Sequence, residues 1–282
     1  MRPRDLWLRF ETYHDVTYFT PESRAVTDAL GCRGGWMGYF GMRAAPLGAA
    51  SPEVVTSACF GFAPWMVHRA LPDAWEVASP RRFLAARLEG VDAALRRILG
   101  DVSGLAEAAE LAVEAASRAS TAGRVLGAAN AALPLPPQPH LALWQACTTL
   151  RESRGDGHLA ALVAADLEPC EALVLFGADK GLEPAYLRSA RGWSEDEWAA
   201  AEAALRDRGL LADGLTAAGR ELRAEVERRT DEAAARPWTA LGPERTARFA
   251  ELMTPVARLV GERNEAMRTN PMAIDPVREL PA

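Results

Sequence analysis

The chain has 282 residues, of which 49% are hydrophobic and 25% charged, and its formal net charge is −6. These values are ordinary for a globular protein and allow two domains of usual size. The acidic balance disfavours nucleic acids and anionic membranes as partners, because no basic patch stands out to offset it. The four cysteines are scattered without a CxxC pair, and neither a signal-peptide pattern nor a run of about 18 apolar residues occurs. The sequence therefore predicts a cytoplasmic protein that does not cross the membrane.

Aromatic residues make up only 7% of the chain, which favours helices over a β-sandwich. The first predicted helix covers residues 5–17. One of its faces carries residues at helical spacing, namely Leu6, Phe10, Tyr13 and Thr17. His14 and Tyr18 flank this face, and a histidine in that position is a candidate haem ligand, metal ligand or general base. The alternative is a histidine at the edge of the core, satisfied by a backbone carbonyl or a tyrosine hydroxyl.

A glycine-rich turn is expected at residues 33–40, RGGWMGYF, where three aromatic side chains gather: Trp36, Tyr39 and Phe40. Residues 102–123 predict an amphipathic helix. The segment 133–139, LPLPPQP, holds four prolines and cannot be helical. We interpret this segment as a linker between two units, residues 1–132 and 140–269, followed by an extended tail at 270–282.

The two units resemble each other in sequence. A shift of 120 positions aligns residues 30–67 with residues 150–187 without a gap. The most informative identical pairs are those of residues with special backbone properties: Gly35/Gly155, Gly61/Gly181 and Pro64/Pro184. We interpret this match as an ancient duplication. The predicted fold class is mainly α, with tandem duplicated helix-turn-helix or winged-helix-like units.

The second unit begins with short predicted helices over residues 140–152, 157–167, 169–178 and 183–190. Between the first two lies RESRGDGH, whose two glycines are expected to break the helix and expose backbone amides to a ligand. The candidate ligand contacts here are Arg151, Arg154, Asp156 and His158. If this turn faces the aromatic turn of the first unit, the two enclose a small-molecule pocket. The alternative is that Asp156 only caps a helix that begins at Gly157.

The end of the second unit has the pattern of a winged helix. Ser194 and Glu197 have the spacing of a capping box, which opens a helix over residues 194–209. Residues 210–215, LLADGL, are expected to form a small β wing, and a long helix follows over residues 216–235.

Six phrases of the sequence belong together as a set: HDVTYFTPESRA, WMGYFGMRAAPLG, GFAPWMVHRALPDAW, LRESRGDGHLAAL, RGWSEDEWAAA and GLTAAGREL. They resemble an actinobacterial group of helix-turn-helix proteins related to SalK, over nearly the whole chain. The resemblance implies a helix-turn-helix scaffold but no particular reaction or ligand. Ser153 departs from it, because a histidine is expected there. Residues 191–230 also resemble the MarR type of winged-helix regulator.

A winged-helix regulator meets DNA with the first turn of its recognition helix. In this chain that turn reads Ser194-Glu195-Asp196-Glu197, and its carboxylates repel phosphates. The candidate DNA contacts are therefore Arg188 and Arg191, just before the helix, together with Ser194. The acidic turn argues against specific DNA binding.

No motif of a known catalytic class occurs, and the four histidines form no spaced pair of metal ligands. The sequence therefore predicts no metal site and identifies no cofactor. We favour a protein that binds a small-molecule ligand as a sensor or accessory factor. A MarR-like transcriptional regulator is the first alternative. An enzyme or a haem or metal protein that uses His14 and His158 is the second.

Overall fold

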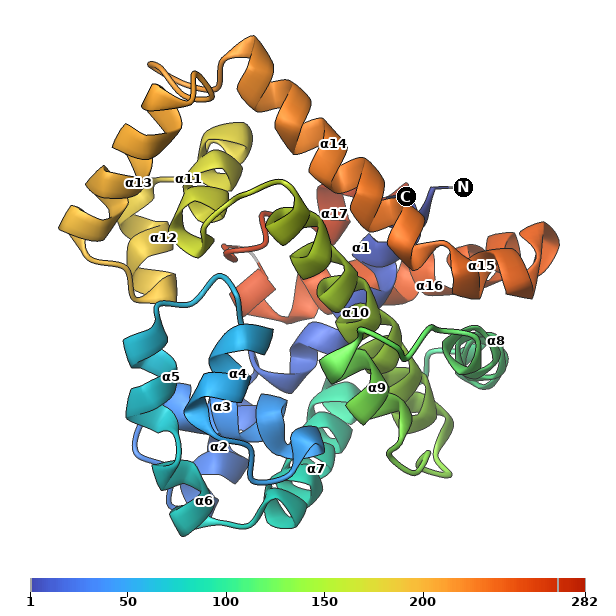
Figure 1. Cartoon of the computed structure of the whole chain (residues 1–282). Coiled ribbons are helices and arrows are strands. Elements are labelled where there is room, and N and C mark those ends of the chain that lie inside the picture. Colours follow the sequence, from blue (N-terminus) through green and yellow to red (C-terminus); the bar gives the residue numbers. More distant parts are fainter. Residues whose placement is uncertain (1, 268, 282) are drawn as a thin grey trace.

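The structure, a computed structural model, describes residues 2–267 and 269–281 and is mainly helical (Figure 1). Before the proline-rich segment the helices are α1 (Pro3–His14), α2 (Pro21–Leu30), α3 (Gly35–Ala44), α4 (Pro52–Ala58), α5 (Pro64–Ala70), α6 (Asp73–Val77), α7 (Pro80–Leu99), α8 (Leu105–Ser117) and α9 (Val125–Ala131). After it they are α10 (Pro139–Ala164), α11 (Pro169–Lys180), α12 (Pro184–Arg191), α13 (Glu195–Asp207), α14 (Ala217–Ala234), α15 (Arg236–Leu241), α16 (Pro243–Arg263) and α17 (Pro276–Glu279). Short 3₁₀ turns lie at Asp15–Thr17, Ala45–Leu47 and Glu265–Met267.

Proline opens most of these helices. Its ring fixes φ near the helical value, and the N–H that it lacks is one that the first turn leaves unpaired anyway. Side-chain caps add to the proline at two of these starts, where Thr20 caps α2 and Ser79 caps α7. Thr216 caps α14, which begins without a proline. The capping box predicted for Ser194 and Glu197 is confirmed at the start of α13.

The break predicted at Gly155 and Gly157 is wrong, because α10 continues through both glycines. Packing on both sides of α10 outweighs the helix-weakening effect of glycine, about 1 kcal/mol for each. Gly157 lets Arg124 cross the helix, since a Cβ at this position would lie 2.0 Å from Arg124 Nη1. That guanidinium donates to the carbonyls of Ser153 (2.7 Å) and Ala233 (3.1 Å).

The β wing is also corrected. Between α13 and α14, the described residues contain no strand, and one isolated antiparallel bridge joins Leu211 to Leu215. The segment is too short for a ladder, since the bridged residues are separated only by the turn around Asp213 and Gly214. Helices α11 to α14 are therefore connected by turns alone.

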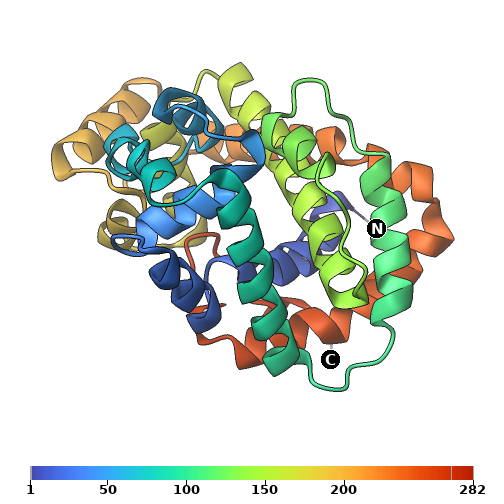
Figure 2. The same ribbon diagram turned by 90° about the horizontal axis from the view of Figure 1, so that it is seen from below.

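The largest apolar core draws on both sides of the proline-rich segment. It joins α1, α7, α8, α10, α15 and α16 around buried residues such as Phe10, Trp144 and Phe249. A second core lies among α3 to α7, and a third among the end of α10 and α11 to α14. The helices of these last two cores form two groups, α3 to α7 and α11 to α14. In Figure 1 the two groups lie one above the other on the left, with α10 running beside both. Figure 2 shows the same two groups at one end of the molecule and α8 at the other.

The two groups meet where α5 begins and α12 ends. The amide of Ala63 donates to the carbonyl of Arg191 at 2.8 Å. Two indoles cross the contact in opposite directions: Trp65 Nε1 donates to the Gly192 carbonyl (2.6 Å), and Trp193 Nε1 donates to the Gly61 carbonyl (3.1 Å). This reciprocal pairing fixes the two groups against each other.

The helix order is the one that a duplication predicts. Shifted by 120 positions, α4 and α5 fall within α11 and α12, and α3 falls on the last part of α10. The duplication itself stays a prediction, which superposition of the two backbones tests. The tail at 270–281 packs on α16 and contains the short helix α17. None of the described helices is both long and apolar enough to cross a bilayer.

The course of α10 can be tested with two glycine substitutions. Gly155→Ala should raise the free energy of unfolding by up to about 1 kcal/mol, because the site lies inside a helix and its Cβ would have contacts of 3.9 Å. Gly127→Ala in α9 should lower it by about 1–3 kcal/mol, because its Cβ would lie 2.7 Å from the Cα of Ser153. Urea unfolding measures both. Destabilisation by Gly155→Ala would favour a turn instead of a continuous helix.

Candidate functional site

One face of α10 lines a cavity of about 240 Å³ between the two groups of helices. Arg151, Arg154, Gly155 and His158 lie on this face, since they follow at intervals of three and four residues. We call the space the arginine cavity, because arginines from four helices line it: Arg4, Arg43, Arg151, Arg154 and Arg191. Glu11 and Glu227 are the lining carboxylates.

One wall of the arginine cavity is a buried chain of ion pairs. Glu11 and Glu152 both pair with Arg151, at 3.1 and 2.8 Å. Glu152 also accepts two bonds of 3.2 Å from Arg43, whose Nη1 donates to the Tyr39 hydroxyl at 2.9 Å. Burial alone would raise the pKa of Glu152, but Arg151 and Arg43 outweigh it and lower this pKa to about 2. Glu152 therefore stays charged.

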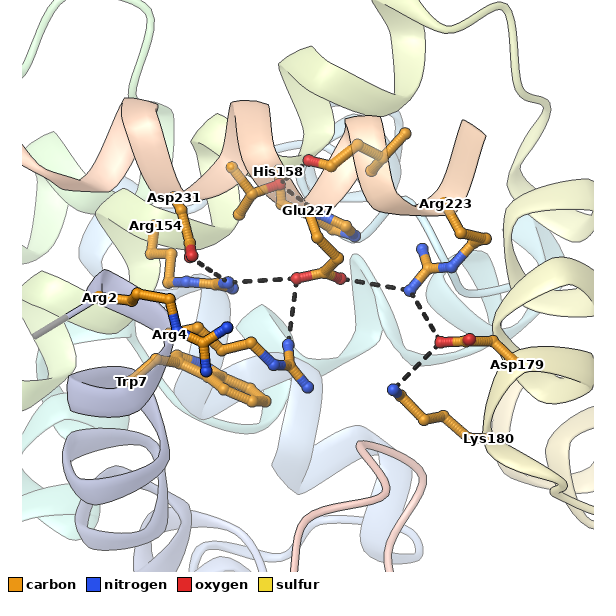
Figure 3. A network of polar contacts seen from close by, with 12 residues as sticks. Arg2, Arg4, Trp7, Arg154, His158, Asp179, Lys180, Arg223, Glu227 and Asp231 are labelled. Atoms are coloured by element: carbon orange, nitrogen blue, oxygen red, sulfur yellow. Dashed lines mark hydrogen bonds and ion pairs between the residues drawn. The ribbon is translucent and has the colours of Figure 1, made fainter. Parts of the chain in front are cut away.

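The opposite wall is centred on Glu227 of α14, as Figure 3 shows. Its carboxylate pairs with Arg4 (3.0 Å), Arg223 (3.2 Å) and Arg154 (3.5 Å). Arg154 pairs in addition with Asp231 at 3.2 Å. Burial opposes ionisation, but the surrounding cations lower the pKa of Glu227. This carboxylate ties α1, α10 and α14 together.

The two candidate histidines are not brought into one site. His158 lines the arginine cavity, and its Nδ1 lies 2.9 Å from Thr230 Oγ1. His14 is fully buried, with its Nδ1 3.0 Å from Thr148 Oγ1. Positions 148 and 158 of a helix are about 15 Å apart along its axis. Within the described residues, no three His, Cys, Asp or Glu side chains gather as metal ligands.

Asp156 has a structural partner that neither sequence interpretation named. Its Oδ2 accepts a bond of 2.8 Å from the amide of Gly127, which lies in the first turn of α9. The carboxylate therefore satisfies a free amide of a different helix, where the helix dipole also favours a negative charge. Asp156 lines neither of the two hollows considered as sites.

The aromatic residues of the first unit form a continuous cluster in which neighbouring rings meet edge-on or tilted. His14 contacts Tyr18 with centroids 5.4 Å apart, and Tyr18 contacts Tyr39 at 4.6 Å. Phe40 is fully buried. Trp36 contacts Tyr39 with centroids 5.5 Å apart. Of the aromatic residues predicted to contact a ligand, Trp36 is the one that lines a second, larger hollow.

This larger hollow has a volume of about 880 Å³ and lies on the other side of the contact between the two groups of helices. We call it the tryptophan cleft, because Trp36, Trp65 and Trp193 line it. Its charged lining residues are Arg33, Arg69, Asp73 and Arg188, and Ser194 is among its polar ones. Two of the candidate DNA contacts, Arg188 and Ser194, thus face this cleft, whereas Arg191 lines the arginine cavity.

Sequence reasoning missed several lining residues. Trp65 carried the clearest signal, because this tryptophan follows the proline that begins a short helix. The structure leaves it 51% exposed. Arg4, Arg43 and Glu227 carried none, because they are distant in sequence and meet only in the fold.

The pH dependence of stability tests the environment of His158. Burial, aided by Arg154 and Arg223, lowers the pKa of His158 to about 4, so folding favours the neutral ring. Its contribution to stability is complete above the unfolded pKa of about 6.5 and is lost as the pH falls toward 4.

His158→Gln keeps an amide near Thr230 but does not titrate. The stability of the wild type relative to this variant should therefore fall by about 1–2 kcal/mol between pH 7 and pH 5, as measured by urea unfolding. If the unfolding free energies of the wild type and His158→Gln changed in parallel with pH, the lowered pKa of His158 would be contradicted.

Comparison with known proteins gives one match. A family model described as "Helix-turn-helix family" matches residues 3–267. No curated protein and no solved structure matches this chain. Because the match covers nearly the whole chain, and the connected short helices α11 to α14 agree with it, the chain belongs to this helix-turn-helix family.

Proposed function

We propose that this protein binds a small molecule in the tryptophan cleft and acts as a cytoplasmic sensor or accessory factor on a helix-turn-helix scaffold. The observation that carries the proposal is a hollow of about 880 Å³ lined by three indoles and three arginines. That volume is within the range of sites for drug-sized ligands, about 300–1,000 Å³.

The lining residues indicate the chemistry of the ligand. Indole rings stack on planar aromatic groups, and guanidinium groups bind carboxylate, sulfonate or phosphate. Arg33 pairs with Asp73, and Arg188 pairs with Glu195 at 2.7 Å. Arg69 has no ion pair with any described residue. A planar aromatic anion is therefore the class of ligand that we propose.

The aromatic surface of the cleft is held in place before any ligand binds. Trp65 and Trp193 each donate their indole N–H to a carbonyl of the other group of helices. Such bonds limit rotation of the rings, so less side-chain entropy is lost on binding. Trp36 and Trp65 remain 39% and 51% exposed, which leaves apolar area for a ligand to cover.

A DNA-binding regulator is the second candidate, and the helix-turn-helix family together with the MarR resemblance favours it. The charge of α13 opposes it. The exposed side chains of α13 are acidic or small with one exception: Glu195, Asp196, Glu197, Ala199, Ala200, Ala203, Arg206 and Asp207. The Ser194 hydroxyl donates a hydrogen bond of 2.7 Å to the Glu197 carboxylate, so it is already engaged within the helix start. This face would repel the phosphates of a DNA groove.

Ligand binding can be tested with anilinonaphthalene sulfonate, an aromatic anion that carries a planar naphthalene ring. It should bind the native protein at one site, and Trp65→Ala should weaken binding about tenfold, the effect of losing about 1.4 kcal/mol of stacking and buried area. The matched control is Leu135→Ala, because Leu135 is 50% exposed and outside the cleft. Fluorescence titration measures both. Equal effects of the two variants would mean non-specific binding to exposed apolar surface.

DNA binding is expected to be weak. At a salt concentration of about 0.15 M, a mobility-shift assay with the promoter of the protein's own gene should show no complex tighter than the non-specific range of 10⁻⁴–10⁻⁶ M, roughly. A nanomolar complex with a steep salt dependence would instead establish the second candidate.

A further inference from the structure

The charges around the arginine cavity are not balanced. Arg4, Arg43, Arg151 and Arg154 each have at least one carboxylate within 3.5 Å. Arg191 has no ion pair with the described residues. With the described residues, its guanidinium makes one hydrogen bond, to the carbonyl of the preceding Ala190 at 3.4 Å. The cavity therefore carries an uncompensated positive charge at Arg191.

Backbone geometry places Arg191 at this position. It is the last residue of α12, and Gly192 follows with a φ of 81°. This left-handed residue ends the helix, and the bond from the Ala63 amide to the Arg191 carbonyl anchors the turn at 2.8 Å. The guanidinium then lies over the Phe62 ring, 4.5 Å from its centroid. The Phe62 ring therefore covers one face of the guanidinium, and the N–H groups at its edge are left to bind another group.

The direction of the pKa shift of Arg191 agrees with the lack of a carboxylate partner. Burial lowers the pKa of Arg191, and Arg43 and Arg151 lower it further, although Tyr39 opposes them. Arg154, which also lines the cavity, is paired by contrast: its Nη2 donates to Glu227 and Asp231, although its buried Nε has no hydrogen bond with the described residues.

We infer that the arginine cavity is a second binding site, specific for a compact oxyanion such as a carboxylate or phosphate, and that Arg191 is the main residue that binds the anion. A guanidinium edge binds either group through two parallel N–H···O bonds. The volume of about 240 Å³ is below the usual range for drug-sized ligands. The site therefore suits a small acid or a single anionic group.

This site is separate from the tryptophan cleft and does not depend on the function proposed for it. The two share no lining residue. They are adjacent, however, because Arg191 lines one and Gly192 lines the other. Phe62, which lies under Arg191, also contacts Trp36 with centroids 5.7 Å apart.

The experiment compares thermal unfolding of the wild type and Arg191→Gln at neutral pH, with ionic strength held constant by sodium chloride. The probes are inorganic phosphate, malonate and, as a neutral match for malonate, malonamide. Phosphate or malonate should raise the Tm of the wild type in a saturable manner, and malonamide should not. A response to phosphate alone assigns a phosphate group, and a response to malonate alone assigns a carboxylate.

Arg191→Gln should no longer respond to either anion, and calorimetric titration should show binding at least tenfold weaker. Arg206→Gln, on the exposed side of α13, is the control and should respond as the wild type does. The inference is overturned if neither anion produces a saturable shift or if Arg191→Gln responds fully.

Discussion

The structure depends on the charges that α10 carries into the interior. Glu152, Arg154 and Asp156 are all less than 9% exposed, and an ion buried without a partner costs several kcal/mol. Each of these charges therefore needs a partner, and each partner comes from a different segment. Glu152 takes Arg43 of α3, Arg154 takes Glu227 and Asp231 of α14, and Asp156 takes an amide of α9. These contacts fix the helices that surround α10.

The arginine cavity lies among the ion pairs of α10. The reciprocal indole bonds join the two groups of helices between this cavity and the tryptophan cleft. The walls therefore consist of charged and aromatic side chains that are already ordered. Such preorganised walls suit ligand binding, and they differ from the acidic exposed surface of α13, which is poorly suited to DNA.

The sequence predicted the local features better than the distant ones. The capping at Ser194 and the buried face around Phe10 depend on neighbouring residues, so their patterns are visible in the sequence. The helix through Gly155 and Gly157 was missed, because its stability comes from packing against α8, α9 and α14. Arg151, Arg154 and His158, which the sequence predicted in a turn, lie together on one face of α10; their role in ligand binding stays a prediction. Arg4 and Glu227 could not be found, since they meet only across the folded chain.

We propose that the buried charges of α10 lock both halves of the chain into one folding unit, with the two proposed binding sites at their junction. Scanning calorimetry tests it most directly. A single unit gives one transition, with a calorimetric enthalpy equal to the van't Hoff enthalpy, and Glu152→Gln should shift that whole transition to lower temperature. Two separable transitions, only one of which moves in Glu152→Gln, would contradict the claim.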